Sequence, residues 1–83
     1  MVNADDIRGY VREQIIEPAR QQKQGIIHVR AGDVHTAMGL VNRMPLICAA
    51  IDAQKLLDFA RVTLIRRSGP HQGLSVEWVF ALE

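Results

Sequence analysis

Residues 31–51 read AGDVHTAMGLVNRMPLICAAI, and this stretch decides the fold. Asp33 is placed to cap a short helix over residues 34–38, because its carboxylate can accept a hydrogen bond from a first-turn N–H. Gly39 can adopt the positive φ that ends such a helix, and Leu40 can then fold back onto the core. A second helix is predicted to follow at once, so the stretch contains two helices joined by a tight turn.

The second helix is predicted over residues 42–54. Asn42 is the candidate N-cap, and Pro45 then falls in the first turn, where its missing N–H would have no intrahelical partner. Cys48 is predicted on the side or the outward face of this helix, as a small, partly buried residue. Helical spacing assigns the inward face to Leu46, Ile47, Ala50, Ile51 and Gln54.

An apolar stripe near the start of the chain predicts a further helix. Ile7, Val11 and Ile15 recur every four residues, which is typical of a helix with one buried face. Pro18 would break the regular hydrogen bonding, so we expect the helix to end, kink or restart near residue 17. A domain this small needs the stripe in its core, although the same positions could extend into a dimer interface.

Three segments rich in β-branched and aromatic residues are predicted to be strands. In the first strand, Ile27 and Val29 share the buried face. A loop containing two glycines and a proline, residues 68–73, joins the other two. The predicted strands cover residues 26–30, 62–67 and 74–82, and the last of them alternates as Leu74, Val76, Trp78, Phe80 and Leu82. The expected order of elements is α–β–α–α–β–β.

Length and composition narrow the class of protein. The 83 residues suffice for a single domain over residues 1–83, and a net charge of +1 argues against a strong non-specific nucleic-acid binder. Cys48 is the only cysteine, so no internal disulfide can form and a reduced, cytoplasmic setting is expected. No stretch approaches the roughly 18 apolar residues of a membrane span.

The element order, together with the motif at 31–51, resembles the winged helix–turn–helix superfamily. Within it, the chain is similar to small prokaryotic proteins with a comparable RAGDVH…GL.NRMP signature. The resemblance implies an α+β fold with a three-helix core and a C-terminal β-hairpin. It also implies that residues 42–54 enter the major groove of DNA while a wing at residues 64–76 touches phosphates or the minor groove. The link after Gly39 is about two residues longer than in the tightest members, and His35 replaces a frequent alanine.

Side chains around the second helix and the hairpin provide the candidate DNA contacts. Arginine reads guanine and asparagine reads adenine in a major groove, although Asn42 could serve only as a cap and Arg43 could be only solvated. Basic residues beside glycines in a wing suit phosphate contacts. The candidate DNA-binding residues are Asn42, Arg43, Lys55, Arg66, Arg67 and His71.

The sequence predicts a binding protein with no catalytic activity, cofactor or metal. It contains no cysteine or histidine pair with the spacing of zinc ligands, such as C-x2-C or H-x3-H. Its glycines do not form a phosphate-binding motif, because the Gly-Lys-Ser/Thr ending is absent. The first hypothesis is that the protein binds double-stranded DNA and acts as a transcription regulator or accessory factor. The second is a protein-interaction module that presents Met44, Ala49 and the first helix to a partner or to its own copy. Near-neutral charge favours the second hypothesis.

Overall fold

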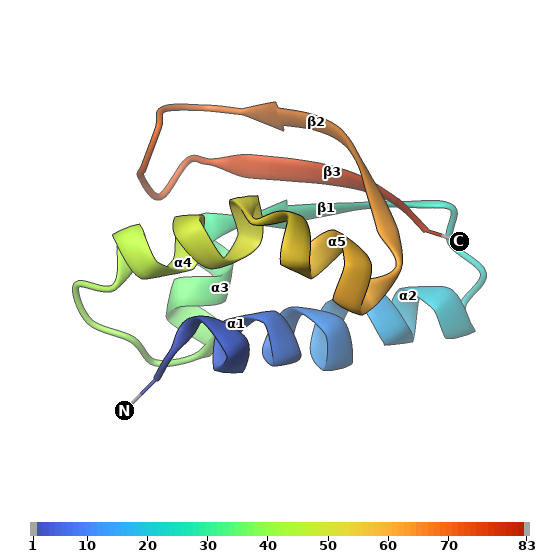
Figure 1. Cartoon of the computed structure of the whole chain (residues 1–83), viewed down its shortest axis with the longest axis horizontal. Coiled ribbons are helices and arrows are strands. Elements are labelled where there is room, and N and C mark those ends of the chain that lie inside the picture. The colour runs from blue at the N-terminus through green and yellow to red at the C-terminus, as the bar shows by residue number, and fades with distance from the viewer. Residues whose placement is uncertain (1, 83) are drawn as a thin grey trace.

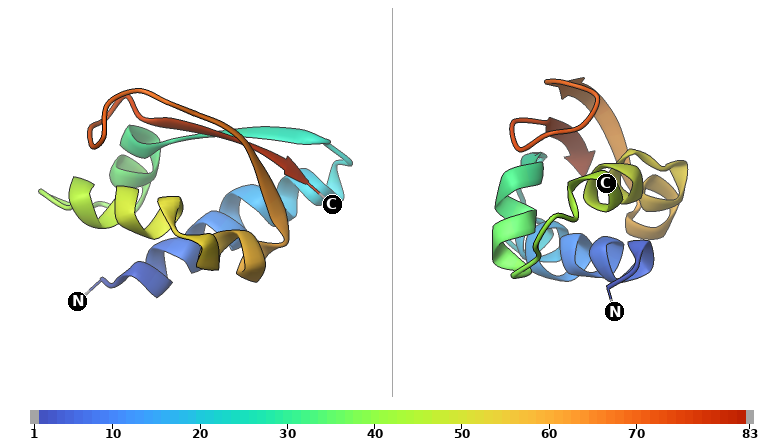
Figure 2. Two further views of the ribbon diagram at one scale, coloured as in Figure 1. Left: turned by 45° about the horizontal axis from the view of Figure 1, so that its top comes forward. Right: turned by 90° about the vertical axis from the view of Figure 1, so that its left-hand side faces the viewer.

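The helices cover one face of a three-stranded antiparallel sheet, as the views in Figure 1 and Figure 2 show. This computed structural model describes residues 2–82. The fold is α+β, as the sequence predicted. In chain order its elements are α1 (Ala4–Val11), the π-helical η1 (Arg12–Ile16), α2 (Glu17–Gln21), β1 (Ile26–Arg30), α3 (Ala31–Ala37), α4 (Met44–Asp52), α5 (Gln54–Ala60), β2 (Val62–Ser68) and β3 (Glu77–Leu82).

The elements α1, η1 and α2 form one continuous helical rod. The wider π-helical turn lies directly before Pro18, whose ring would clash with the preceding turn of a regular α-helix. The helix therefore restarts at residue 17, as predicted. The π turn also shifts the buried stripe, so that Ile16 is fully buried while Ile15 is only half-buried. The expected 7–11–15 stripe is corrected to 7–11–16.

The sheet has the order β1–β3–β2, with both pairs antiparallel. Strand β1 has the predicted bounds, and Trp78 and Phe80 on the central strand are fully buried. The prediction that the last strand starts at residue 74 was wrong, because β3 begins at Glu77 and Leu74 is 64% exposed. The preceding segment instead turns back towards α3.

That returning segment explains why Asp33 is not an N-cap. Helix α3 begins at Ala31, directly after β1, and its first N–H groups donate to backbone carbonyls of the loop between β2 and β3. The Ala31 N–H bonds Val76 O at 2.8 Å, and the Gly32 N–H bonds Leu74 O at 3.1 Å. Backbone carbonyls therefore satisfy groups that a side-chain cap would otherwise serve.

The predicted helix at 42–54 needs correction at both ends. Asn42 lies in the loop with φ +55°, a conformation that asparagine tolerates, and Arg43 occupies the N-cap position without a side-chain bond. At the other end Ala53 is extended and separates α4 from α5. Gly39 ends α3 with φ +66°, as predicted.

The core lies between the helices and the inner face of the sheet. Ile47, Ala50 and Ile51 are buried as predicted, whereas Gln54 is exposed and Leu46 is half-buried. Cys48 on α4 is fully buried, where only partial burial was predicted, and the unpredicted core residues include Leu56 on α5. Within residues 2–82, no helix combines the length and apolar character needed to cross a bilayer.

Candidate nucleic-acid interface

The α3–α4 loop (residues 38–43) and the wing loop (residues 69–76) lie at the same end of the molecule. Figure 1 shows both at the left, and Figure 2 shows them on either side of the start of α4. Gly69 and Gly73 in the wing loop adopt φ of +99° and +158°. This end brings together the two segments that the sequence singled out for DNA contact.

Asn42 and Arg43 are exposed at the start of α4. Among the described residues, neither side chain takes part in a hydrogen bond or ion pair. The backbone N–H of Arg43 donates to Nε2 of His35 at 3.3 Å, so the histidine on α3 holds the N-cap residue of α4. Both side chains are thus available to an incoming ligand, while the backbone behind them is fixed.

Arg67 is engaged within the protein. Its Nε donates to Oδ1 of Asp52 at 2.8 Å, and its guanidinium lies 5.8 Å from the centre of the Trp78 ring. Its other nitrogens donate to the carbonyls of Pro70 at 3.0 Å and His71 at 2.6 Å. Arg67 therefore holds the base of the wing and has little capacity left for a phosphate.

Asp52 is a structural residue that the sequence analysis missed. Its Oδ1 accepts both from Arg67 and from Nε1 of the fully buried Trp78, the latter at 2.7 Å. The last residue of α4 is thereby tied to β2 and β3. No local sequence signal indicates this role, because the partners lie 15 and 26 residues away.

Arg66 and His71 lie on exposed parts of the wing. Arg66 is paired with Val79 in the sheet register and therefore occupies the opposite face from Arg67. His71 lies in the tip, where its carbonyl accepts from Arg67. These two residues remain as candidate backbone contacts.

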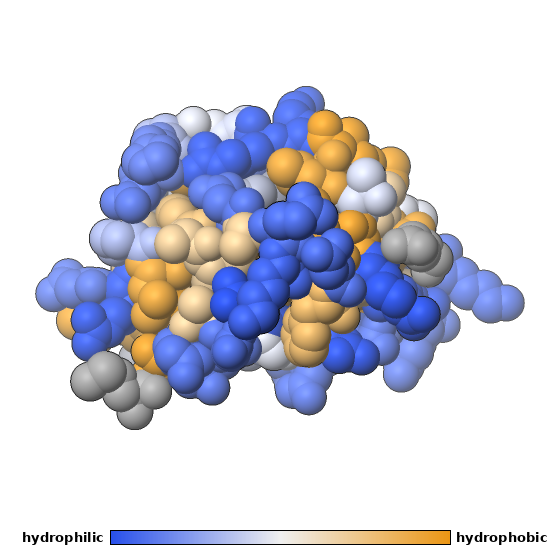
Figure 3. Space-filling model, in the orientation of Figure 1, coloured by the Kyte–Doolittle hydropathy of each residue, from blue (hydrophilic) through white to orange (hydrophobic). Residues whose placement is uncertain are grey.

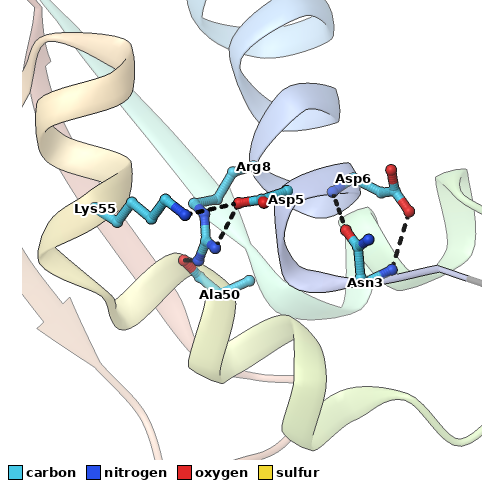
Figure 4. Close-up of polar contacts among 6 residues, drawn as sticks. All are labelled: Asn3, Asp5, Asp6, Arg8, Ala50 and Lys55. Atoms are coloured by element: carbon cyan, nitrogen blue, oxygen red, sulfur yellow. Dashed lines mark hydrogen bonds and ion pairs between the residues drawn. The ribbon is translucent and has the colours of Figure 1, made fainter.

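Lys55 forms an exposed ion pair with the first helix. Its Nζ lies 3.3 Å from Oδ1 of Asp5, which also accepts from Nη2 of Arg8 at 2.8 Å (Figure 4). Arg8 is buried and donates to the carbonyl of Ala50 at 3.2 Å, so it joins α1 to α4. The hydrogen bond from Arg8, followed by that from Lys55, lowers the pKa of the Asp5 carboxyl below its ordinary value.

The outward face of α4 is short of positive charge. Within α4 the exposed residues are Pro45, Ala49 and Asp52, and none of them is a lysine or an arginine. Figure 3 shows apolar surface over α4. A ligand with negative charge would therefore meet the N-terminal end of this helix rather than its length.

Within residues 2–82, no three metal-ligating side chains converge, and the single cysteine is buried in the core. Comparisons of the chain with protein-family models, curated proteins and solved structures gave no match.

Proposed function

We propose that this chain is a winged-helix protein that binds double-stranded DNA, as a transcription regulator or accessory factor. One observation carries the proposal. The α3–α4 loop and the β2–β3 loop lie at the same end of a fold whose sheet has the order β1–β3–β2, and Arg43 and Asn42 are exposed there. That arrangement is the one in which a winged helix contacts a duplex.

The proposed docking uses the end of α4. Arg43 reads a guanine edge and Asn42 an adjacent base, while the positive end of the helix dipole faces the DNA backbone. In the wing, the glycines allow the main chain to approach phosphates closely, and Arg66 and His71 supply charge and hydrogen bonds. Arg67 acts indirectly by fixing the wing.

Fluorescence anisotropy with about two helical turns of duplex DNA tests this proposal. Binding should appear at low salt and weaken with a log–log slope of about −0.9 for each phosphate neutralised. Arg43→Ala and Arg66→Ala should each weaken it. The matched control is Lys23→Gln, which removes one charge from an exposed residue beyond α2. Absence of binding at low salt, or equal losses from all three variants, would contradict the docking.

A protein-contact role is the second candidate, and the outward face of α4 favours it. Exposed Pro45 and Ala49 lie beside the half-buried Met44 and Leu46, which together form a mostly apolar surface. Sedimentation velocity of the native chain and of Ala49→Glu tests the homodimer form of this idea. A dimer that dissociates in the variant supports it, and a native monomer at all concentrations rejects it.

A further inference from the structure

Strand β1 has one unpaired edge. The bonds from Leu82 N–H to Gly25 O at 2.9 Å and from Ala31 N–H to Val76 O at 2.8 Å fix which residues face β3. Because hydrogen-bonded pairs alternate along an antiparallel ladder, the groups facing β3 belong to residues 25, 27, 29 and 31. The N–H and C=O groups of Ile26 and His28 therefore point to the free edge, together with the N–H of Arg30.

A groove runs along this free edge, between β1 and the helical rod. It consists of two adjoining cavities of about 380 and 280 Å³ that share Ile15 and His28 as lining residues. All five residues of β1 line one or the other cavity. The opposite wall includes the apolar Tyr10, Ile15, Pro18 and Ala19, and the polar side chains from outside β1 that also line the cavities are Gln14, Gln22, Gln24 and Asp33. The groove thus pairs a row of free backbone groups with a partly apolar wall, over about 17 Å of strand.

The charges beside the groove select the ligand. The exposed side chains of His28 and Arg30 lie on the outer face of the sheet, which also carries Arg66 two strands away. Oε2 of Glu77 lies 3.7 Å from Nδ1 of His28 and 3.8 Å from Nη2 of Arg30. Glu77 is the one acidic residue on this face among the described strands. A strand added at the edge would place alternate side chains beside Arg30, on a face where Arg30 and Arg66 outnumber the single Glu77, and the others against the apolar part of the wall.

We propose that the β1 edge binds an extended peptide of a partner protein in which apolar and acidic residues alternate. The peptide adds a fourth strand, and its main chain bonds the free groups of Ile26, His28 and Arg30. Acidic side chains then neighbour Arg30, and apolar side chains enter the groove. A second copy of the chain fits less well as the partner. If two β1 edges paired antiparallel about His28, the two histidines would lie opposite each other and no acidic side chain would lie beside Arg30.

This inference is independent of the proposed function. None of the six candidate DNA-binding residues lines either cavity in the described chain. A protein that holds DNA at one end could therefore hold a peptide along β1 at the same time.

Amide chemical shifts of the isotopically labelled full chain test the proposal. The probe is a short capped peptide in which valine and glutamate alternate. Amides of residues 26, 28 and 30 and of the facing rod should shift on titration. His28→Pro removes one edge donor at a position where proline is compatible with an edge strand, and it should weaken binding about tenfold. The matched comparison is His28→Ala, which loses the same side chain but keeps the edge N–H, so it should weaken binding less than His28→Pro does.

A second variant tests whether charge selects the peptide, and it keeps the proposal testable if the proline variant does not fold. Arg30→Glu should weaken the valine–glutamate peptide and favour a valine–lysine peptide. Three results would overturn the proposal: shifts confined to other surfaces, equal affinity of the native chain for both peptides, or equal affinities of the proline and alanine variants. Shifts of the same amides with protein concentration alone would assign the edge to a second copy and would also overturn it.

Discussion

The wing and the α3–α4 loop lie at the same end of the molecule but are held in different ways. At the base of the wing, Arg67 bonds Asp52 and two loop carbonyls and lies over Trp78. The α3–α4 loop has backbone turns, the bond from Arg43 N–H to His35 and core packing by Met38 and Leu40, while its Val41 is 75% exposed. The wing is positioned by side chains of distant elements, whereas the loop carries side chains that are free to bind.

The difference shows that proximity to a candidate interface does not decide the role of an arginine. Arg66 and Arg67 are neighbours in the chain, but they lie on opposite faces of β2. The inner one serves the structure and the outer one is available to a ligand. The following predictions test this division of roles.

Removing the acceptor beneath the wing should have the largest effect on stability. Asp52→Ala leaves the indole N–H of Trp78 buried without a partner and should lower the free energy of unfolding by about 1–3 kcal/mol. Urea denaturation followed by tryptophan fluorescence measures this loss. Asp52→Asn keeps an acceptor and should lose less. Equal stabilities of the native chain and the alanine variant would show that the wing base is not held as described.

Changing the glycine that starts the α3–α4 loop should have a smaller effect. Gly39→Ala should cost about 1 kcal/mol, because φ is +66° and no atom lies within 4 Å of the new methyl group. The matched control is Gly9→Ala, inside α1 with equally open surroundings. It should stabilise the chain by about 0.5–1 kcal/mol. Thermal denaturation of both variants measures the change in melting temperature. Changes of the same sign in the two variants would contradict this prediction.

Arg43 and Arg67 should separate binding from stability. Arg43→Ala should change the free energy of unfolding by less than about 0.5 kcal/mol, because the side chain is exposed and unpaired within residues 2–82. It should nevertheless weaken DNA binding. Arg67→Ala should destabilise the chain and weaken binding only through the wing. Denaturation and anisotropy on the same samples check this, and a destabilised Arg43 variant would contradict the account.

The smallest effect is expected from the ion pairs of Asp5. Its pKa is lowered in the folded chain, so it stabilises the fold above its unfolded value near 3.8 and loses that contribution as the pH falls further. Asp5→Asn should therefore be slightly less stable at neutral pH and match the native chain in strong acid. Denaturation curves at several pH values test this, and a constant difference between the two proteins would contradict it.

Local patterns predicted most of the fold. Strand β1 was predicted to the residue, because Ile27 and Val29 alternate with exposed neighbours. The starts of α3 and β3 were mispredicted for one shared reason, since the bonds from Ala31 and Gly32 to Leu74 and Val76 join segments far apart in the sequence.

The candidate site was predictable only in part. The exposure of Arg43 followed from its place before α4. The engagement of Arg67 did not, because Asp52 and Trp78 reach it through the tertiary fold. The free edge of β1 was equally hidden, since the sequence does not reveal which strand is central.

An NMR titration of the labelled chain with duplex DNA, which follows the chemical shifts of the backbone amides, tests the central claim most directly. The account predicts that shifts gather in the α3–α4 loop, the first turn of α4 and the wing loop, while β1 and α2 remain unchanged. Shifts gathered along β1 or the helical rod, or spread evenly over every basic residue, would contradict it.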